Sequence, residues 1–321
     1  MHAFNTVIEF LDGAFESDGS KIVVDGRTLQ LNDVFFKQVV GGAGGRLGFV
    51  DAGSGLLLEG AGACVGFVRT YGCVWGDKKE RLLDERFVVV VAKGERHLEA
   101  SIFTKEGALT NQLQLDAFDP RISLQGKRAY PRDVLGVVRT WLEFAMVERL
   151  CPKVGEQGVV IRDGDLSARG ELLEDALRNI ESVAKSLNVL VLGIAKTSTA
   201  LTDSGKSASL VLMERGPKGC WVFDAGVDVC FIKLHERSKF VFRCDVVGNL
   251  ALLPQALASL AKTAVDPVFL GYPYGLLDAD RLAQVTKQEE EQLRLQFAIK
   301  SKERFGQLER STSAHGILDG L

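Results

Sequence analysis

The sequence predicts an α/β fold in which helices flank a mixed sheet. Three β-type runs follow one another between residues 47 and 103 with short connections, which predicts an antiparallel meander. Helical and apolar β-type patterns then alternate, which is typical of βαβ units. The run NVLVLGIAK, residues 188–196, is apolar almost throughout, as expected of a strand covered on both faces of its sheet.

The elements follow a definite order. The meander consists of LGFVDAGSGLLL from Leu47, ACVGFVRTYGCVW, and ERFVVVVAKGERHLEASIF. Pro131 then opens a helical pattern that we expect Cys151-Pro152 to end. A strand over Val159–Asp163, a helix over 171–187 and the apolar strand complete the series. Three meander strands followed by βαβ crossovers match the RNase H-like fold.

The two ends of the chain add to this core. Residues 1–45 contain the Gly-rich stretch Gly41–Gly45 and are predicted to be a flexible lead-in. Residues 46–321 are predicted to form one domain whose C-terminal part elaborates the sheet. Further strands are expected over 208–213, 220–223, 229–234 and 239–247, followed by two helical segments, the last over 278–304.

Composition limits the possible functions. The chain has 321 residues, 46% of them hydrophobic, and a formal net charge of −3, so no global positive field marks it as a simple DNA-binding protein. Six scattered cysteines without a CxxC pair favour reduced core thiols over a zinc site. No signal peptide and no membrane span is apparent, so we expect a cytoplasmic protein with no membrane partner.

Two aspartates are predicted at strand ends next to glycine. Asp51 lies in GFVDAGSG, which we interpret as a strand followed by a Gly-Ser turn, and Asp163 lies in VVIRDGDLSARG. Such carboxylates can meet at a sheet edge and bind Mg²⁺ or Mn²⁺, which prefer oxygen ligands. Asp51 could instead cap its own turn, and Asp165 is expected to be the N-cap of the following helix.

A third carboxylate is expected from the helix that begins at Pro131. Arg132, Arg139 and Glu143 form one polar stripe on this otherwise apolar helix. Glu143 is the predicted ligand, with an Arg139–Glu143 salt bridge as the structural alternative and Glu148 as the alternative acid. Together with Asp51 and Asp163, Glu143 would form the acidic set with which two-metal nucleases bind two Mn²⁺ or Mg²⁺ ions.

The motifs GFVDAGSG, VIRDGDL and LVLGIAKTS resemble those of the NurA nucleases, and FIKLHERSKFVFR and LGYPYGLLDADRLA are similar to later segments of that family. The resemblance covers most of residues 46–300. It implies that Asp51, Glu143 and Asp163 bind metal and act in catalysis, with Lys196 facing phosphate nearby. A family tyrosine aligns with Tyr272 or Tyr274.

The family's active-site histidine has no direct counterpart. Asp280 stands where it would be sought, so the fourth metal ligand is either Asp280 or, as a substitute for the family histidine, His315. The resemblance further implies a metal-dependent nuclease for DNA ends and single strands in double-strand break repair and end resection. A homodimer working with a HerA-type hexameric ATPase is the expected assembly.

The sequence leaves two alternative functions to consider, an NTPase and a non-catalytic scaffold. Asp203–Ser207, DSGKS, resembles the end of an NTP-binding P-loop, but Ala200 replaces its first glycine and the following SASLVLME is predicted to be a strand where a helix is needed. An RNase H-like scaffold that binds DNA or an ATPase without cutting is the remaining alternative. It would be favoured by loss of any one of the three acids, and all three are present.

Overall fold

The computed structural model describes residues 2–13, 19–42, 44–76, 78–119, 122–123, 126–168, 170–224 and 228–301. The chain divides into two compact units, each described by itself. The first unit comprises Met1–Arg46, Val154–Leu166 and Ala184–Leu277. The second unit comprises Leu47–Lys153, Ser167–Val183 and Asp278–Leu321.

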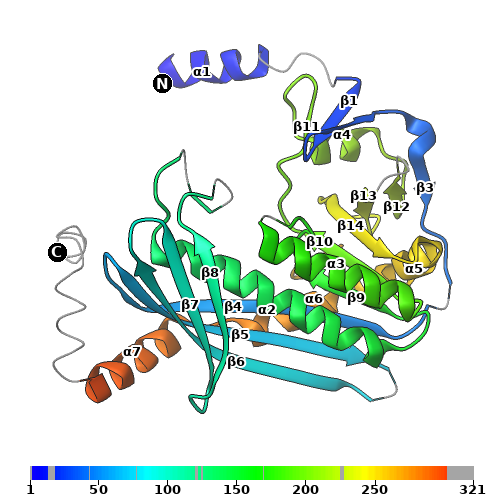
Figure 1. Cartoon of the computed structure of the whole chain (residues 1–321). Helices are drawn as coiled ribbons and strands as arrows, with labels where there is room; N and C mark the ends of the chain where they lie inside the picture. The colour runs from blue at the N-terminus through cyan, green and yellow to red at the C-terminus, as the bar shows by residue number, and fades with distance from the viewer. Residues whose placement is uncertain are drawn as a thin grey trace. The chain divides into compact units, whose positions relative to one another are not determined.

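The second unit contains the predicted meander, with five described strands where the sequence indicated three. They pair antiparallel in the order β4 (Leu47–Glu59), β5 (Ala63–Trp75), β6 (Glu80–Lys93), β7 (His97–Thr104) and β8 (Leu109–Asp116) (Figure 1). The run expected as one strand over 85–103 is a hairpin that turns at Gly94, whose φ of +70° suits glycine. The last strand, LTNQLQLD, is mostly polar and exposed, so it lacks an apolar run.

Helix α2 (Pro131–Val154) covers one face of these strands. A Cβ at Gly66 would lie 2.5 Å from Leu135, and one at Gly72 would lie 2.9 Å from the Met146 sulfur, so two strand glycines let the helix approach. The helix was predicted to stop before Pro152 and instead continues to Val154. A proline so near the end of a helix displaces few backbone hydrogen bonds, and Gly155, at φ +75°, follows the last turn.

Helix α7 (Lys287–Ser301) covers the opposite face. Leu293 and Phe297 pack against Leu57 of β4 and Phe67 of β5. The next residue of β5, Val68, packs on the α2 side, because successive side chains of a strand point to opposite faces. The segment expected as one helix over 278–304 is divided: α6 (Tyr274–Ala283) ends before α7 begins.

The first unit contains the two parallel strands of the predicted βαβ crossover, β9 (Val159–Asp163) and β10 (Leu190–Ala195). Helix α3 (Glu171–Ser186) joins them along the chain, and its residues up to Val183 belong to the second unit. All six residues of β10 are buried, as its apolar sequence predicted. The strand order continues from β9 and β10 through β14 (Phe242–Gly248), β13 (Val229–Lys233), β12 (Trp221–Phe223) and β3 (Phe36–Gln38).

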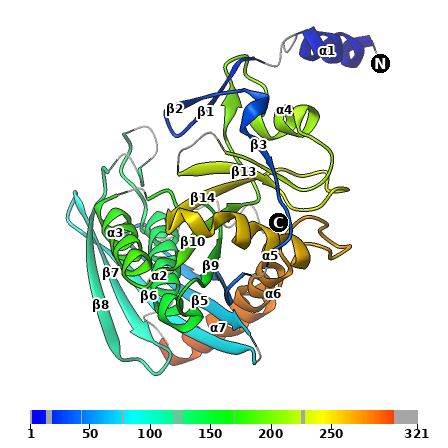
Figure 2. The same cartoon turned by 90° about the vertical axis from the view of Figure 1, so that its right-hand side faces the viewer.

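The N-terminal residues contribute strands that the sequence analysis did not assign. A small antiparallel sheet contains β11 (Leu201–Thr202), β1 (Lys21–Val24) and β2 (Arg27–Gln30). Figure 2 shows β1 and β2 near α4. The other short elements are α1 (His2–Gly13), η1 (Asp33–Phe35), α4 (Ala208–Arg215), η2 (Leu250–Leu252) and α5 (Leu253–Thr263).

The strand predicted over 208–213 is wrong, because these residues begin helix α4. Ala208, Val211 and Leu212 are buried while Leu210 is 64% exposed, which is the three- and four-residue spacing of a helix. All six cysteines are free thiols, five of them buried. Within the described ranges, no helix is both long and apolar enough to cross a membrane.

Candidate metal centre

Asp51 was predicted at the end of a strand. It lies instead in the interior of strand β4. The strand continues through Ala52, Gly53 and Ser54 to Glu59, so no Gly-Ser turn follows the acid. Gly53 serves a different purpose: a Cβ there would lie 2.3 Å from the carbonyl oxygen of Ala283, the last residue of α6. The glycine therefore admits the end of α6 against β4, beside Asp51.

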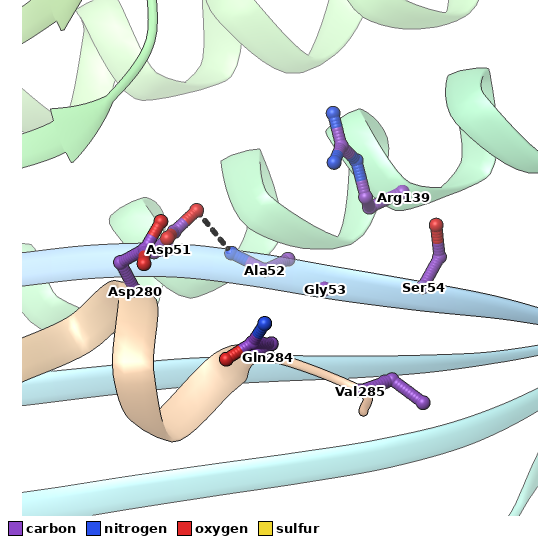
Figure 3. Close-up of a pocket in the computed structure, with 8 residues that line it drawn as sticks. All are labelled: Asp51, Ala52, Gly53, Ser54, Arg139, Asp280, Gln284 and Val285. Atoms are coloured by element: carbon purple, nitrogen blue, oxygen red, sulfur yellow. Dashed lines mark hydrogen bonds between the residues drawn. The ribbon is translucent and has the colours of Figure 1, made fainter. Parts of the chain in front are cut away.

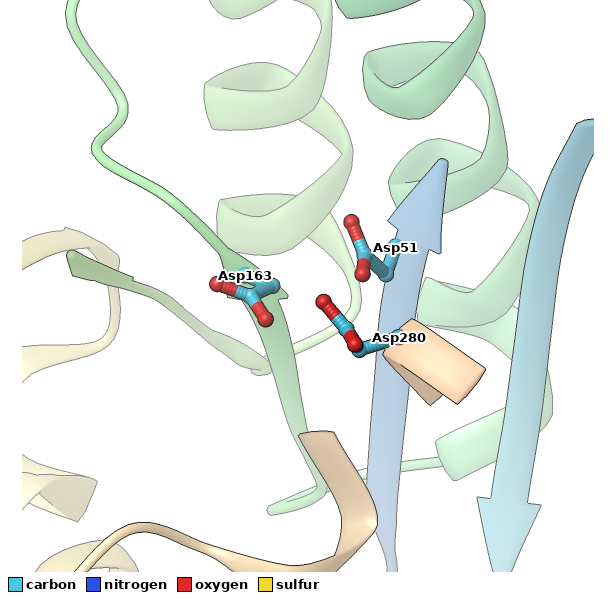
Figure 4. Close-up of side chains that lie close together, drawn as sticks. All are labelled: Asp51, Asp163 and Asp280. Carbon is cyan, nitrogen blue, oxygen red and sulfur yellow. The ribbon is translucent and has the colours of Figure 1, made fainter. Parts of the chain in front are cut away.

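This close approach brings Asp280 to Asp51. Asp280 is an exposed residue of α6, and one of its carboxylate oxygens lies within 4.8 Å of one from the partly buried Asp51. Figure 4 shows the two side chains reaching toward each other from β4 and α6. The residue that departs from the NurA pattern is thus placed at the predicted metal centre.

Glu143 lies next to Asp51 through a shared hydrogen-bond donor. The backbone N–H of Ala52 donates to Asp51 Oδ1 at 2.7 Å and to Glu143 Oε1 at 3.0 Å. Glu143 is only 1% exposed on α2, so its carboxylate is withdrawn from water close to a second acid. Such a placement costs free energy unless a cation or hydrogen bonds offset it.

Asp51 and Asp280 line a polar hollow of about 240 Å³ in the second unit. Figure 3 shows Asp51 and Asp280 toward one end and Arg139, on α2, beside Ser54 toward the other. Gln284 and Val285 form the wall that follows α6. The expected Arg139–Glu143 salt bridge is not formed, since Arg139 makes no ion pair and its Nε no hydrogen bond in the described part of the chain.

The first unit brings three other predicted residues together. Asp163 is the last residue of β9 and pairs in register with Ile194 of β10, and Lys196 directly follows the end of β10 at Ala195. Lys196 Nζ lies 2.7 Å from Asp163 Oδ2 and 5.4 Å from the centre of the Tyr272 ring. Tyr272 is fully buried and stacks on Phe269.

The loop that follows Asp163 is held by a buried ion pair that the sequence analysis missed. Gly164 adopts φ +124°, and Leu166 N–H donates to Asp245 Oδ2 at 2.7 Å. Arg243 Nε in turn donates to Asp245 Oδ1 at 2.7 Å. Burial raises the pKa of Asp245 against the opposing effect of Arg243. The separation of these residues in sequence, about 80 positions, left no local signal.

The other candidates are not placed at these sites. His315 lies outside the described residues. Tyr274 begins α6 and is 42% exposed, and Glu148 lies on α2 five residues beyond Glu143. Asp165 is not the N-cap of α3: that helix begins at Glu171, and Gly170 O accepts from Leu173 N and Glu174 N.

A P-loop remains excluded, although one of the two reasons given against it was wrong. Helix α4 does follow DSGKS, contrary to the predicted strand. The Asp203 carboxylate, however, accepts hydrogen bonds from Ser20 N at 2.8 Å and Lys21 N at 3.2 Å. The first residue of DSGKS therefore anchors residues 20 and 21 of the chain, and Ala200 still replaces the first glycine of a P-loop.

Comparison with known proteins identifies the fold as RNase H-like. No family model and no curated protein sequence matches the chain. The structure is similar to the NurA nuclease from Sulfolobus solfataricus, with a TM-score of 0.53 and 11% identity over 94% of this chain and 95% of that one. This likeness confirms the fold resemblance seen in the sequence.

Two other nuclease structures match less closely. The catalytic domain of human Endonuclease V gives a TM-score of 0.34 and 14% identity, covering 79% of this chain and 85% of that chain. A. aeolicus Argonaute gives a TM-score of 0.34 and 11% identity, covering 79% of this chain and 29% of that chain.

The side chains suit a hard divalent cation. Asp51, Glu143 and Asp280 present carboxylate oxygens in the second unit, and Asp163 presents another in the first. Mg²⁺ and Mn²⁺ take such ligands, whereas a zinc site would use cysteine or histidine. The donor set therefore fits the ions that the sequence predicted.

Proposed function

We propose that the protein is a metal-dependent DNA nuclease that hydrolyses phosphodiester bonds at DNA ends and in single strands. The observation that carries this proposal is the approach of the Asp51 and Asp280 carboxylates beside the buried Glu143. The NurA-type fold supports it. We further propose, from the resemblance of VIRDGDL to the NurA motif, that Asp163 also contributes a carboxylate to the ion bound by Asp51 and Asp280.

The chain's own groups would then divide the work of hydrolysis. Bound Mn²⁺ or Mg²⁺, one ion or two, supplies Lewis-acid chemistry to the phosphodiester. Glu143, held by the Ala52 N–H beside Asp51, orients water for attack on phosphorus and accepts its proton. The phosphorus–oxygen bond to the leaving strand breaks, and the leaving oxygen takes a proton from water, which gives one phosphate end and one hydroxyl end. Lys196 donates to a phosphate oxygen, and Tyr272 supports the ammonium group through its ring.

Cleavage of linear DNA tests this function. The full chain is incubated with end-labelled single-stranded and duplex DNA in Mn²⁺, Mg²⁺, Ca²⁺ or EDTA, beside Asp51→Asn as the inactive control. We expect cleavage in Mn²⁺ or Mg²⁺ and none in EDTA. Cleavage in EDTA, or equal cleavage by Asp51→Asn, would contradict the proposal, and tight DNA binding without cleavage would favour a non-catalytic scaffold.

We also propose that the nuclease acts in the cytoplasm, as a homodimer, with a HerA-type hexameric ATPase in double-strand break repair and end resection. The support is the NurA-type fold and the net charge of −3, which gives the chain little general attraction for DNA. A motor that feeds the strand would overcome this weak binding. Processive digestion of duplex by the isolated chain at physiological salt would contradict the need for such a partner.

A further inference from the structure

Arg139 differs from the other described arginines of α2. Arg132 pairs with Glu59 at 2.9 Å and Arg149 pairs with Asp84 at 3.0 Å, and both are about half exposed. Arg139 is partly buried, its Nε is shielded from solvent, and it forms no ion pair within the described residues. A shielded Nε–H without an acceptor is unfavourable, and no carboxylate in the described ranges offsets the charge of this guanidinium, so an anion from outside the chain would stabilise it.

The position of Arg139 indicates what this anion is. The arginine lines the same hollow as Asp51 and Asp280, and Figure 3 shows it toward the end away from the two acids. Val138 and Leu142, its neighbours on α2, pack in the core against the sheet, so the helix fixes where the side chain starts. A cation bound by the acids cannot satisfy a guanidinium, whereas a phosphate can.

We propose that Arg139 binds a backbone phosphate of the DNA strand next to the phosphate that is cut. Its planar fork of N–H donors matches two phosphate oxygens, which a lysine cannot reproduce. This inference rests on the proposed nuclease function. It assigns Arg139 to holding the strand in register with the metal centre and gives it no part in binding the ion.

The test compares Arg139→Ala and Arg139→Lys with Arg132→Ala. The control removes the same charge two turns earlier on the same helix, where the arginine is exposed and outside the hollow. Binding of a fluorescent single-stranded oligonucleotide is measured by anisotropy in Ca²⁺ over a range of salt concentrations, and cleavage is measured in Mn²⁺. Mn²⁺ affinity and melting temperature are measured for each variant.

We expect Arg139→Ala to weaken DNA binding by roughly 10- to 100-fold and to lower the salt dependence by about one phosphate contact. Its Mn²⁺ affinity and melting temperature should equal or exceed those of the wild type, since a guanidinium with an unsatisfied, shielded Nε–H is removed. The DNA affinity of Arg139→Lys should lie between those of the wild type and Arg139→Ala. Arg132→Ala should bind DNA within about twofold of the wild type.

Neutral methylphosphonate linkages then locate the contact. One substituted position beside the cleaved bond should weaken binding by the wild type as much as Arg139→Ala does, and should have no further effect on that variant. Wild-type-like DNA binding by Arg139→Ala, or a parallel loss of Mn²⁺ affinity and melting temperature, would overturn the inference. Arg139-dependent binding without any cleavage would sustain it and remove the nuclease function instead.

Discussion

The carboxylates of Asp51 and Glu143 accept hydrogen bonds from one backbone N–H, that of Ala52, at 2.7 and 3.0 Å. The two acids therefore lie close together, and Glu143 is only 1% exposed. Neighbouring carboxylates repel each other, and this repulsion falls when a divalent cation binds beside them. This relationship links strand β4 to helix α2 at the centre of the proposed nuclease site.

Glu143→Gln separates chemistry from folding. The amide keeps an oxygen that can accept from Ala52 N–H, while the negative charge and the proton-accepting ability are lost. We expect cleavage to fall by at least about 100-fold, as for loss of a general base. The melting temperature should stay unchanged or rise, because repulsion between the two acids is relieved.

Glu148→Gln is the matched comparison for Glu143, on the same helix and outside the pair with Asp51. It should keep the wild-type rate. A Glu143→Gln protein that melts lower yet cleaves normally would show that Glu143 is structural and would transfer the proposed role to Glu148.

Gly53→Ala tests whether the close approach of α6 builds the site. The added Cβ would meet the Ala283 carbonyl, so the end of α6 and Asp280 with it must shift. We expect weaker Mn²⁺ binding by calorimetry and a loss of about 1–3 kcal/mol in the free energy of unfolding. Gly136→Ala is the control: it has open space on α2 and should gain about 1 kcal/mol without changing metal affinity.

Lys196→Met should change metal binding and catalysis in opposite directions. Lys196 Nζ lies 2.7 Å from Asp163 Oδ2, so its positive charge competes with a cation for that carboxylate. Its removal should tighten Mn²⁺ binding several-fold while cleavage falls, because the donor to phosphate is gone. Weaker Mn²⁺ binding in Lys196→Met would show that the lysine acts by positioning Asp163.

Asp280→His should alter the choice of metal. Imidazole nitrogen is accepted by Mn²⁺ but is a poor ligand for Mg²⁺, which prefers oxygen. We expect the ratio of Mn²⁺- to Mg²⁺-supported cleavage to rise by about tenfold or more, whereas Asp280→Asn should lose activity with both ions. An unchanged ratio in Asp280→His would indicate that residue 280 does not contact the ion.

Sequence patterns predicted those parts of the fold that depend on local apolar runs. Strand β10 is buried at every position and was recognised from its uninterrupted apolar sequence. Helix α4 was missed because SLVLM is apolar enough for a strand, and only packing against β1 and its neighbours selects the helical spacing. Strand β8 was missed because its sequence, LTNQLQLD, is mostly polar and none of its residues is fully buried.

The site was predicted in its residue types but not in its construction. Asp163 beside Lys196 follows from the ends of two adjoining parallel strands, which a sequence pattern can indicate. Asp280 reaches Asp51 only because Gly53 admits the end of α6, a contact between residues about 230 positions apart. A separation of about 80 positions likewise hides the support that Asp245 gives to the loop after Asp163.

Titration of Mn²⁺ followed by electron paramagnetic resonance tests the central proposal most directly, because the free ion's signal is lost on binding. We predict that the wild-type chain binds Mn²⁺ and that Asp51→Asn, Asp163→Asn and Asp280→Asn each bind it at least about tenfold more weakly, about 1.4 kcal/mol, with the melting temperature preserved. Wild-type affinity in Asp163→Asn, or no Mn²⁺ binding by the wild type, would contradict the proposal that these aspartates hold the ion for DNA cleavage.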